Sequence, residues 1–193
     1  MKVEVAYDST IFIEKSISEV YLTVLEAIVL VVLVIFLFLR SWRAVLIPIV
    51  TIPVSLIGTF ALMNMLGFSI NILSLLAMVL AIGLVVDDAI VMLENIYRHI
   101  EDGMSPMQAA FKGSAEIGFA IIAMTLTLAA VYLPFAFSTG RTGKLFIEFT
   151  LTLAGAVLVS GFTALTLSPM MCSRLLRHES EHGRFYLWGE RML

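Results

Sequence analysis

The sequence predicts an all-α polytopic membrane protein, and three observations support this fold class. Apolar residues make up 60% of the 193 residues, charged residues make up only 14%, and the mean hydropathy is +1.01. There are too few polar residues to form a polar shell around a core of this size. An ordinary soluble domain is therefore excluded. The apolar residues also fall into five long runs, separated by chain-breaking residues.

Each apolar run is long enough to cross a bilayer. A hydrocarbon core of about 30 Å takes roughly 20 helical residues at about 1.5 Å each. The first run carries one acidic residue, Glu26, the third carries Asp87, Asp88 and Glu94, and the other three are uncharged. The five predicted transmembrane helices cover residues 20–39, 44–66, 70–96, 117–137 and 149–172, all within a transmembrane region at residues 16–177.

Breaks between the runs define the predicted turns. Residues 40–43 form a tight basic turn, Gly67 marks the next break, and two glycines lie in residues 138–144. A longer loop is expected to open at residues 103–106.

Basic residues predict the direction of the chain in the membrane. Eight lie on one side and four on the other, so the positive-inside rule predicts a periplasmic N-terminus and a cytoplasmic C-terminus. The larger group is Arg40, Arg43, Arg98, Lys112, Arg174, Arg177, Arg184 and Arg191. The formal net charge of -3 gives no cationic excess for nucleic acid, and the single cysteine, Cys172, forms no internal disulfide.

The two ends of the chain carry weaker patterns. Residues 2–8 alternate like one short strand, which needs partners that this sequence does not supply. Phe185, Trp188 and Met192 recur at helical spacing, which favours an amphipathic interfacial helix over residues 178–193, with a solvated tail as the alternative.

The third run carries the strongest functional signal, because Asp87 and Asp88 lie close to its middle. One aspartate at mid-membrane costs about 2.5 to 3.5 kcal/mol on insertion scales, so a pair indicates a functional site. Burial beside a second carboxylate favours protonation, so such a group is suited to load and release protons. The alternative is a helix shifted outward, with both aspartates among the inner headgroups.

The five predicted spans contain no lysine or arginine. A countercharge for the aspartates must come from another segment or chain, or else the aspartates are neutral. Adjacent helical residues point about 100° apart, so a cation between neighbouring helices is placed to engage both carboxyls.

Small residues predict where helices approach closely. A stripe of the small-xxx-small kind runs along the fifth span through Ala156, Ser160, Ala164 and Ser168. Gly83 lies four residues before Asp87 and therefore shares its face. Thr163 is placed to reach a carboxyl, although a hydrogen bond to its own helix is favoured.

Two other kinds of site are disfavoured. The three histidines, His99, His178 and His182, are expected in loops or in the tail, solvated and without a metal. An intramembrane aspartyl protease needs two aspartates on separate helices, whereas Asp87 and Asp88 are consecutive. The sequence therefore predicts neither an enzyme nor a resident cofactor.

The third run closely resembles the fourth transmembrane helix of resistance-nodulation-division (RND) efflux transporters. The similarity lies in Gly67-Phe68-Ser69-Ile70-Asn71 and in the run from Ala81 to Asn95 around the two aspartates, and it extends over residues 7–177. The doubled aspartate is similar to the hydrophobe/amphiphile branch, which implies drugs or other amphiphiles as cargo.

The resemblance implies a proton relay of Asp87 and Asp88 with a lysine on a helix outside this chain, driven by the proton gradient. It also implies a homotrimer in the bacterial inner membrane, with a periplasmic adaptor and an outer-membrane channel. The chain resembles only helices two to six, so residues 1–15 correspond to the end of a periplasmic porter domain. The alternative function is a truncated or regulatory membrane module that binds a partner and does not transport alone.

Overall fold

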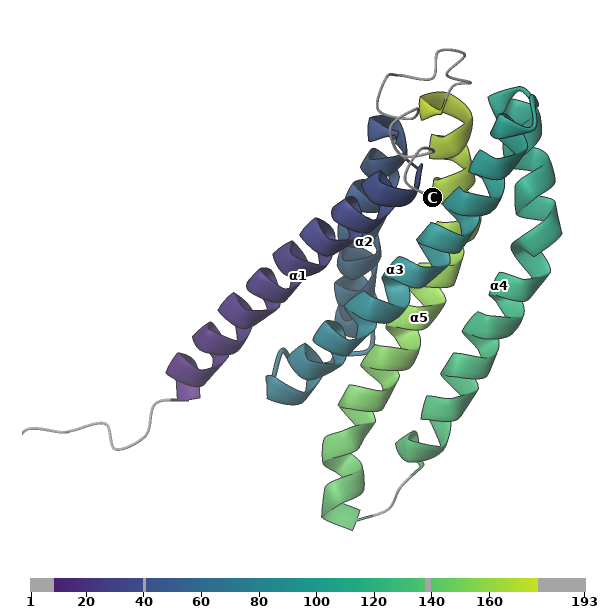
Figure 1. Ribbon diagram of the computed structural model, residues 1–193. Coiled ribbons are helices and arrows are strands. Elements are labelled where there is room, and N and C mark those ends of the chain that lie inside the picture. The colour runs from purple at the N-terminus through teal and green to yellow at the C-terminus, as the bar shows by residue number, and fades with distance from the viewer. Residues whose placement is uncertain (1–8, 40, 138–139, 177–193) are drawn as a thin grey trace, which may run out of the picture.

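The computed structural model describes residues 9–39, 41–137 and 140–176, and all of its regular structure in this part of the chain is helical. Five helices run in alternating directions and form one bundle (Figure 1): α1 Ser9–Leu39, α2 Trp42–Met65, α3 Ile72–Glu101, α4 Pro106–Ala136 and α5 Gly140–Leu175. All five are long and apolar enough to cross a membrane. The predicted five-helix architecture is therefore confirmed, whereas the predicted strand at residues 2–8 and the interfacial helix at residues 178–193 lie outside the described residues.

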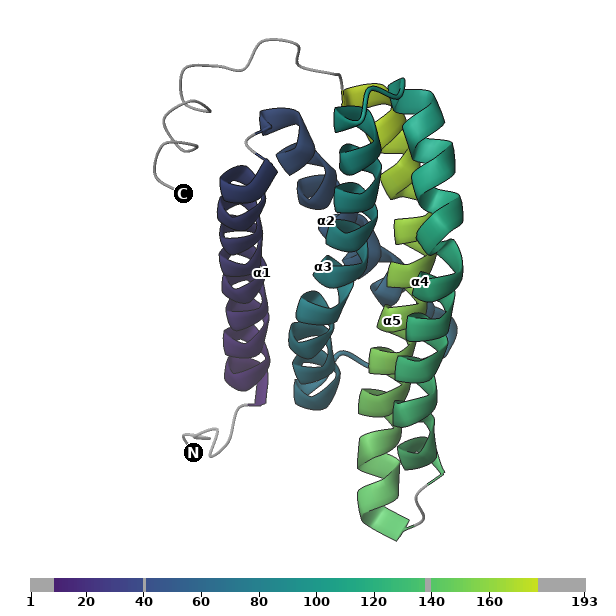
Figure 2. The same cartoon turned by 45° about the vertical axis from the view of Figure 1, so that its right-hand side comes forward.

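The central helices of the bundle are α3 and α5. Helix α5 contacts α2, α3 and α4, whereas α1 contacts only α2 and α3 among the described elements. In both views α1 lies at one edge of the bundle and α4 at the other (Figures 1 and 2). More than half of the residues in the membrane-spanning parts of α3 and α5 are buried, against 6% in α1.

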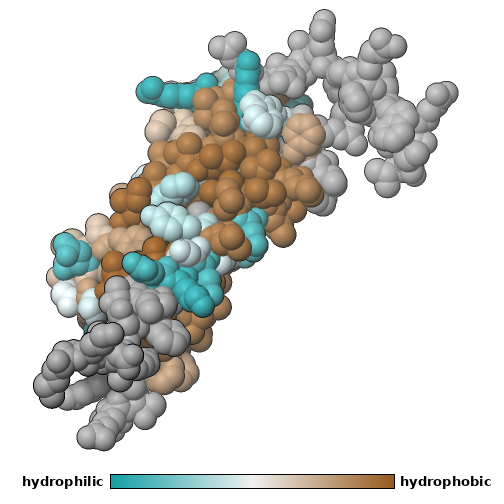
Figure 3. Space-filling view, turned by 90° about the vertical axis from the view of Figure 1, so that its left-hand side faces the viewer, coloured by the Kyte–Doolittle hydropathy of each residue, from teal (hydrophilic) through white to brown (hydrophobic). Residues whose placement is uncertain are grey.

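Large apolar side chains cover the outside of the bundle. On the face shown in Figure 3, hydrophobic side chains form a broad continuous area, and hydrophilic side chains gather toward its upper and lower parts. Exposed examples include Leu25 and Leu33 on α1 and Phe119 on α4. A surface of this kind matches lipid as the surrounding solvent.

The connections between helices lie at two opposite ends of the bundle. The α1–α2 turn, the α3–α4 turn and the last turn of α5 lie at one end (Figure 1), which we call the basic end because it carries Arg43, Arg98, Lys112 and Arg174. This is the end predicted to be cytoplasmic. The α2–α3 and α4–α5 turns lie at the opposite end.

The predicted loop between the third and fourth spans is wrong. Helix α3 continues to Glu101, and α4 already begins at Pro106, so the connection is a tight turn in which Gly103 adopts φ +90°. Ser105 caps α4 by accepting a hydrogen bond from the backbone N–H of Gln108, and a proline suits the first helical position. Hydropathy predicts only the apolar part of this helix, because residues 107–116 include polar and charged side chains.

Asn71 fixes the start of α3. Its side-chain oxygen accepts hydrogen bonds from the backbone N–H groups of Leu73 and Ser74, both at 2.9 Å. The Ser74 hydroxyl in turn accepts the backbone N–H of Asn71 at 2.8 Å, which completes a capping box. The Asn71 side-chain amide also donates to Glu148 of α5. This hydrogen bond joins the first turn of α3 to α5.

Candidate functional site

The two aspartates lie in the middle of α3, as the sixteenth and seventeenth of its 30 residues. Consecutive residues of a helix point about 100° apart, so the two carboxyls face different surroundings. Asp88 is 7% exposed, whereas Asp87 is an exposed residue. The structure therefore separates a pair that looks uniform in the sequence.

Asp88 faces α5 and contacts the small-residue stripe there. The Ser160 hydroxyl donates to Oδ2 of Asp88 across 2.9 Å, and its oxygen also lies 3.3 Å from the backbone oxygen of Val85. Ser160 is 2% exposed, so this contact is shielded from solvent. A buried hydrogen bond joins the two helices at the level of the carboxyl pair.

Small side chains allow this close contact between α3 and α5. Ala77 and Ala81 of α3 are fully buried against Leu153 and Ala156 of α5. The predicted stripe of Ala156, Ser160, Ala164 and Ser168 is buried throughout, with exposed fractions of 2% or less. The stripe therefore lies inside the bundle.

Asp87 faces away from α5, on a stripe of exposed residues that runs the length of α3. We call this the open stripe, and its members are Ile72, Leu76, Leu80, Gly83, Asp87, Val91, Glu94 and Arg98. Among the described residues, Asp87 has no hydrogen-bond or ion-pair partner. A Cβ added at Gly83 would meet no atom within 4 Å. The open stripe thus presents a carboxyl at mid-helix beside a position with free space.

Thr163 and Ala164 are predicted to support the site, but neither side chain forms a hydrogen bond with the carboxyls. The Thr163 hydroxyl donates to the backbone oxygen of Val159, 2.8 Å away, so its expected bond to its own helix is confirmed. Ala164 is 2% exposed and contributes apolar packing. Of the polar residues predicted around the pair, Ser160 alone reaches a carboxyl in the described part of the chain.

His99 is not a loop residue, contrary to the sequence prediction. It lies on α3 and is 5% exposed, and its Nε2 is 2.7 Å from Oε2 of Glu116 on α4. The prediction failed because α3 and α4 both extend beyond the apolar runs and bring their polar ends together. His178 and His182 lie outside the described residues.

The fold and the site together define a polytopic helical membrane protein with two adjacent carboxyls in the middle of a membrane-spanning helix, one buried and one exposed. Comparison with known proteins specifies the class further, because the whole chain, residues 1–193, matches the AcrB/AcrD/AcrF family. The chain belongs to this family, and the predicted resemblance to RND efflux transporters is confirmed.

Individual relatives agree with the family assignment. The chain is 53% identical over 177 residues to the multidrug resistance protein MdtC of Pectobacterium atrosepticum, covering 92% of this chain and 17% of that protein. It is 55% identical over 181 residues to an uncharacterized transporter of Haemophilus influenzae, covering 94% of this chain and 18% of the relative. MdtC of Escherichia coli O9:H4 is 52% identical over 174 residues, with coverages of 90% and 17%. The chain therefore spans less than a fifth of the length of these relatives.

Proposed function

We propose that this chain forms the proton-relay part of a proton-driven efflux transporter that exports hydrophobic or amphiphilic compounds. The single observation that carries the proposal is the pair of mid-helix carboxyls in two environments, Asp88 buried against Ser160 and Asp87 on the open stripe. Ionisable groups inside membrane helices are costly and mark ion pathways. The names of the MdtC relatives support an efflux role.

Ser160 is placed to satisfy Asp88 in both protonation states. A serine hydroxyl has one hydrogen to donate and two lone pairs to accept. When Asp88 is ionised, the hydroxyl donates to Oδ2. When Asp88 is protonated, its own O–H donates to the Ser160 oxygen, and the hydroxyl turns to the backbone oxygen of Val85. A group that loads and releases a proton needs such a partner, because a buried polar atom without one costs about 1–3 kcal/mol.

Asp87 is proposed to meet a cation from outside this chain. Among the described residues, the ion pairs are those of His99 and Lys112 with Glu116, so neither aspartate has a countercharge here. The free space at Gly83 admits a long side chain next to Asp87. We propose that a lysine from a further part of the transporter fills this space and is attracted to the pair only while a carboxyl is ionised.

This arrangement suggests how proton movement drives a conformational change. A proton from the periplasmic side neutralises the ionised carboxyl and releases the cation, and loss of that proton toward the cytoplasm restores the attraction. One proton moving down 100 mV supplies about 2.3 kcal/mol, enough to bias a bistable helix arrangement. The proposed setting is the bacterial inner membrane with a periplasmic N-terminus, in a trimer that works with a periplasmic adaptor and an outer-membrane channel.

The test uses a full-length transporter that contains these residues, reconstituted in proteoliposomes with an imposed pH gradient. Asp87→Asn and Asp88→Asn are each expected to abolish proton-coupled efflux, because an amide neither gains nor loses a proton in this range. Glu101→Gln is the matched control, since Glu101 is an exposed carboxyl in the same helix. Undiminished coupled efflux in both Asn variants would refute the relay and favour a module that only binds a partner.

A further inference from the structure

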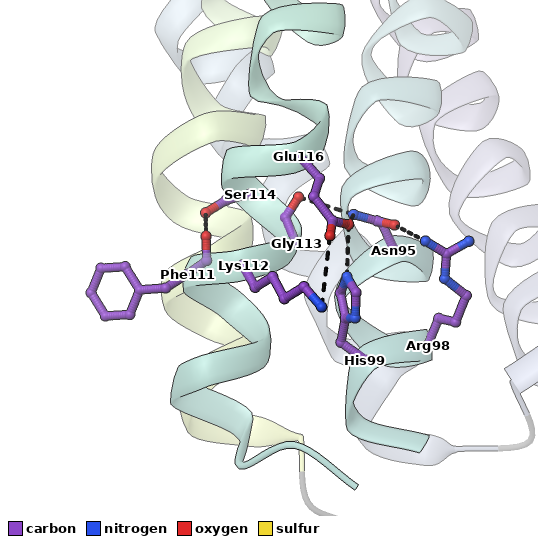
Figure 4. A network of polar contacts seen from close by, with 8 residues as sticks. All are labelled: Asn95, Arg98, His99, Phe111, Lys112, Gly113, Ser114 and Glu116. Atoms are coloured by element: carbon purple, nitrogen blue, oxygen red, sulfur yellow. Dashed lines mark hydrogen bonds and ion pairs between the residues drawn. The ribbon is translucent and has the colours of Figure 1, made fainter. Parts of the chain in front are cut away.

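A network of polar side chains joins α3 to α4 at the basic end (Figure 4). Glu116 is its centre: Oε2 of Glu116 lies 2.7 Å from Nε2 of His99 and 3.4 Å from the side-chain nitrogen of Asn95. The same Asn95 nitrogen donates to the backbone oxygen of Gly113 at 3.0 Å. Arg98 donates to the Asn95 oxygen at 2.8 Å. We call the three inter-helix residues Asn95, His99 and Glu116 the basic-end clamp.

Gly113 brings the two helices close enough for the clamp to form. A Cβ at this position would lie 2.9 Å from Cγ1 of Ile96 and 3.2 Å from its Cα, distances too short without a shift of the α3 backbone. Gly113 is buried, and Ile96 is fully buried. The clamp therefore combines backbone contact with side-chain hydrogen bonds at one crossing point.

The clamp is partly shielded from water, which strengthens its contacts. The His99 side chain is 7% exposed, although that of Glu116 is 40% exposed. Hydrogen bonds to a charged carboxylate are stronger than those between neutral groups. Lys112 lies 4.0 Å from the other Glu116 oxygen, but this exposed pair contributes little.

The middle of α3 is held differently. At the level of the carboxyls, the side-chain hydrogen bonding between α3 and its neighbours in the described part of the chain comes from the Ser160 hydroxyl, which lies within reach of Asp88 and of the backbone oxygen of Val85. Away from the basic end α3 and α4 separate, as both ribbon views show (Figures 1 and 2). The contact at mid-helix depends on Asp88, a group that changes protonation in the proposed relay. The clamp is remote from this group, because His99 follows Asp88 by 11 residues, or roughly 16 Å along the helix axis.

We propose that the basic-end clamp is the fixed point of α3, so that a change in protonation at Asp88 moves the middle of α3 relative to α5 while the basic end stays against α4. This inference rests on the proposed function, because the movement of α3 follows from the proposed change in protonation at Asp88. The clamp residues are positioning residues, because they contact neither aspartate. Their part in the cycle is to turn a local change at the carboxyl pair into a movement of defined direction.

The experiment measures two distances in the 193-residue chain in lipid nanodiscs by double electron–electron resonance, in a Cys172→Ala background. The basic-end pair of spin labels is placed at Glu94 of α3 and Phe119 of α4, and the middle pair at Leu80 of α3 and Leu158 of α5. All four positions are exposed.

The first comparison tests the clamp without reference to transport. His99→Ala and Glu116→Ala are expected to lengthen and broaden the basic-end distance, and Glu101→Ala, which removes an exposed carboxyl nearby, is expected to leave it unchanged. Glu116→Gln keeps an oxygen acceptor for His99 and Asn95 and is expected to restore most of the parent distribution. An unchanged distance in both His99→Ala and Glu116→Ala would overturn the clamp.

The second comparison tests the fixed point. Asp88→Asn mimics the protonated state and is expected to shift the middle distance while the basic-end distance stays the same. A shift of equal size in both pairs would overturn the fixed point but not the relay. A shift in neither pair would overturn the link between protonation and α3 movement, and the first comparison would still decide whether the clamp holds the helices.

Discussion

The two faces of α3 differ more than their sequences suggest. The face toward α5 is closed by small residues and carries Asp88, whose carboxyl is bonded to Ser160. The open stripe carries Asp87 beside Gly83, where an added Cβ would meet no atom within 4 Å. The comparison teaches that one turn of a helix holds one carboxyl inside the structure and leaves the adjacent carboxyl exposed.

Overfilling the closed face is expected to have the largest effect on the fold. Ala81→Leu inserts a large side chain where Ala81 is fully buried against α5 and is expected to cost about 1–3 kcal/mol. Gly83→Leu is the matched change on the open stripe, two residues away, and is expected not to destabilise the chain, because nothing lies within 4 Å of the added Cβ.

Unfolding of the two variants in mixed detergent micelles, followed by circular dichroism, measures this difference. Equal destabilisation by both substitutions would contradict the distinction between the faces. In a full-length transporter, Gly83→Leu is expected to stop transport although the chain folds, because the proposed cation needs that space.

Removing the bond across the closed face is expected to have a smaller effect. Ser160→Ala deletes one hydrogen bond to Asp88 and is expected to destabilise the chain by about 1 kcal/mol. Thr163→Val, on the same helix, removes a hydroxyl that bonds only to its own helix and is expected to change stability less. Equal losses in the same unfolding experiment would mean that Ser160 contributes no inter-helix stability.

The smallest effect is expected at the exposed rim of the basic end. Lys112→Ala removes an ion pair with a nitrogen–oxygen distance of 4.0 Å and two partly exposed partners. Such surface pairs contribute about 0–1 kcal/mol, so the unfolding midpoint is expected to change little. A loss as large as that of Ala81→Leu would show that Lys112 has a structural part in the clamp.

Much of the fold is predictable from the sequence because lipid imposes long apolar helices. The break at Gly67 coincides with the end of α2, whereas the turn predicted at residues 40–43 overlaps α2, which begins at Trp42. Hydropathy predicts all five spans. It missed the polar part of α4 before residue 117, where helix formation depends on the Ser105 cap and on packing against α3. Apolar patterning carries no signal for such polar helical extensions.

The site was predictable only in part. The cost of charge at mid-membrane pointed to Asp87 and Asp88, and four-residue spacing pointed to the stripe that contains Ser160. The bond between Asp88 and Ser160 joins residues 72 positions apart, and the sequence carries no signal for that pairing. His99 was misplaced for the same reason, since its partner Glu116 belongs to a helix whose start the apolar pattern did not show.

Labelling with dicyclohexylcarbodiimide, an apolar reagent that modifies protonated carboxyls within membranes, tests the central claim most directly. In the reconstituted chain, mass spectrometry of the modified peptides is expected to show faster reaction at Asp87, on the open stripe, than at Asp88, which Ser160 and the α5 stripe cover. Ser160→Ala is expected to raise the rate at Asp88 alone. Reaction at Asp88 as fast as at Asp87 in the unmodified sequence would contradict the division of α3 into a closed and an open face.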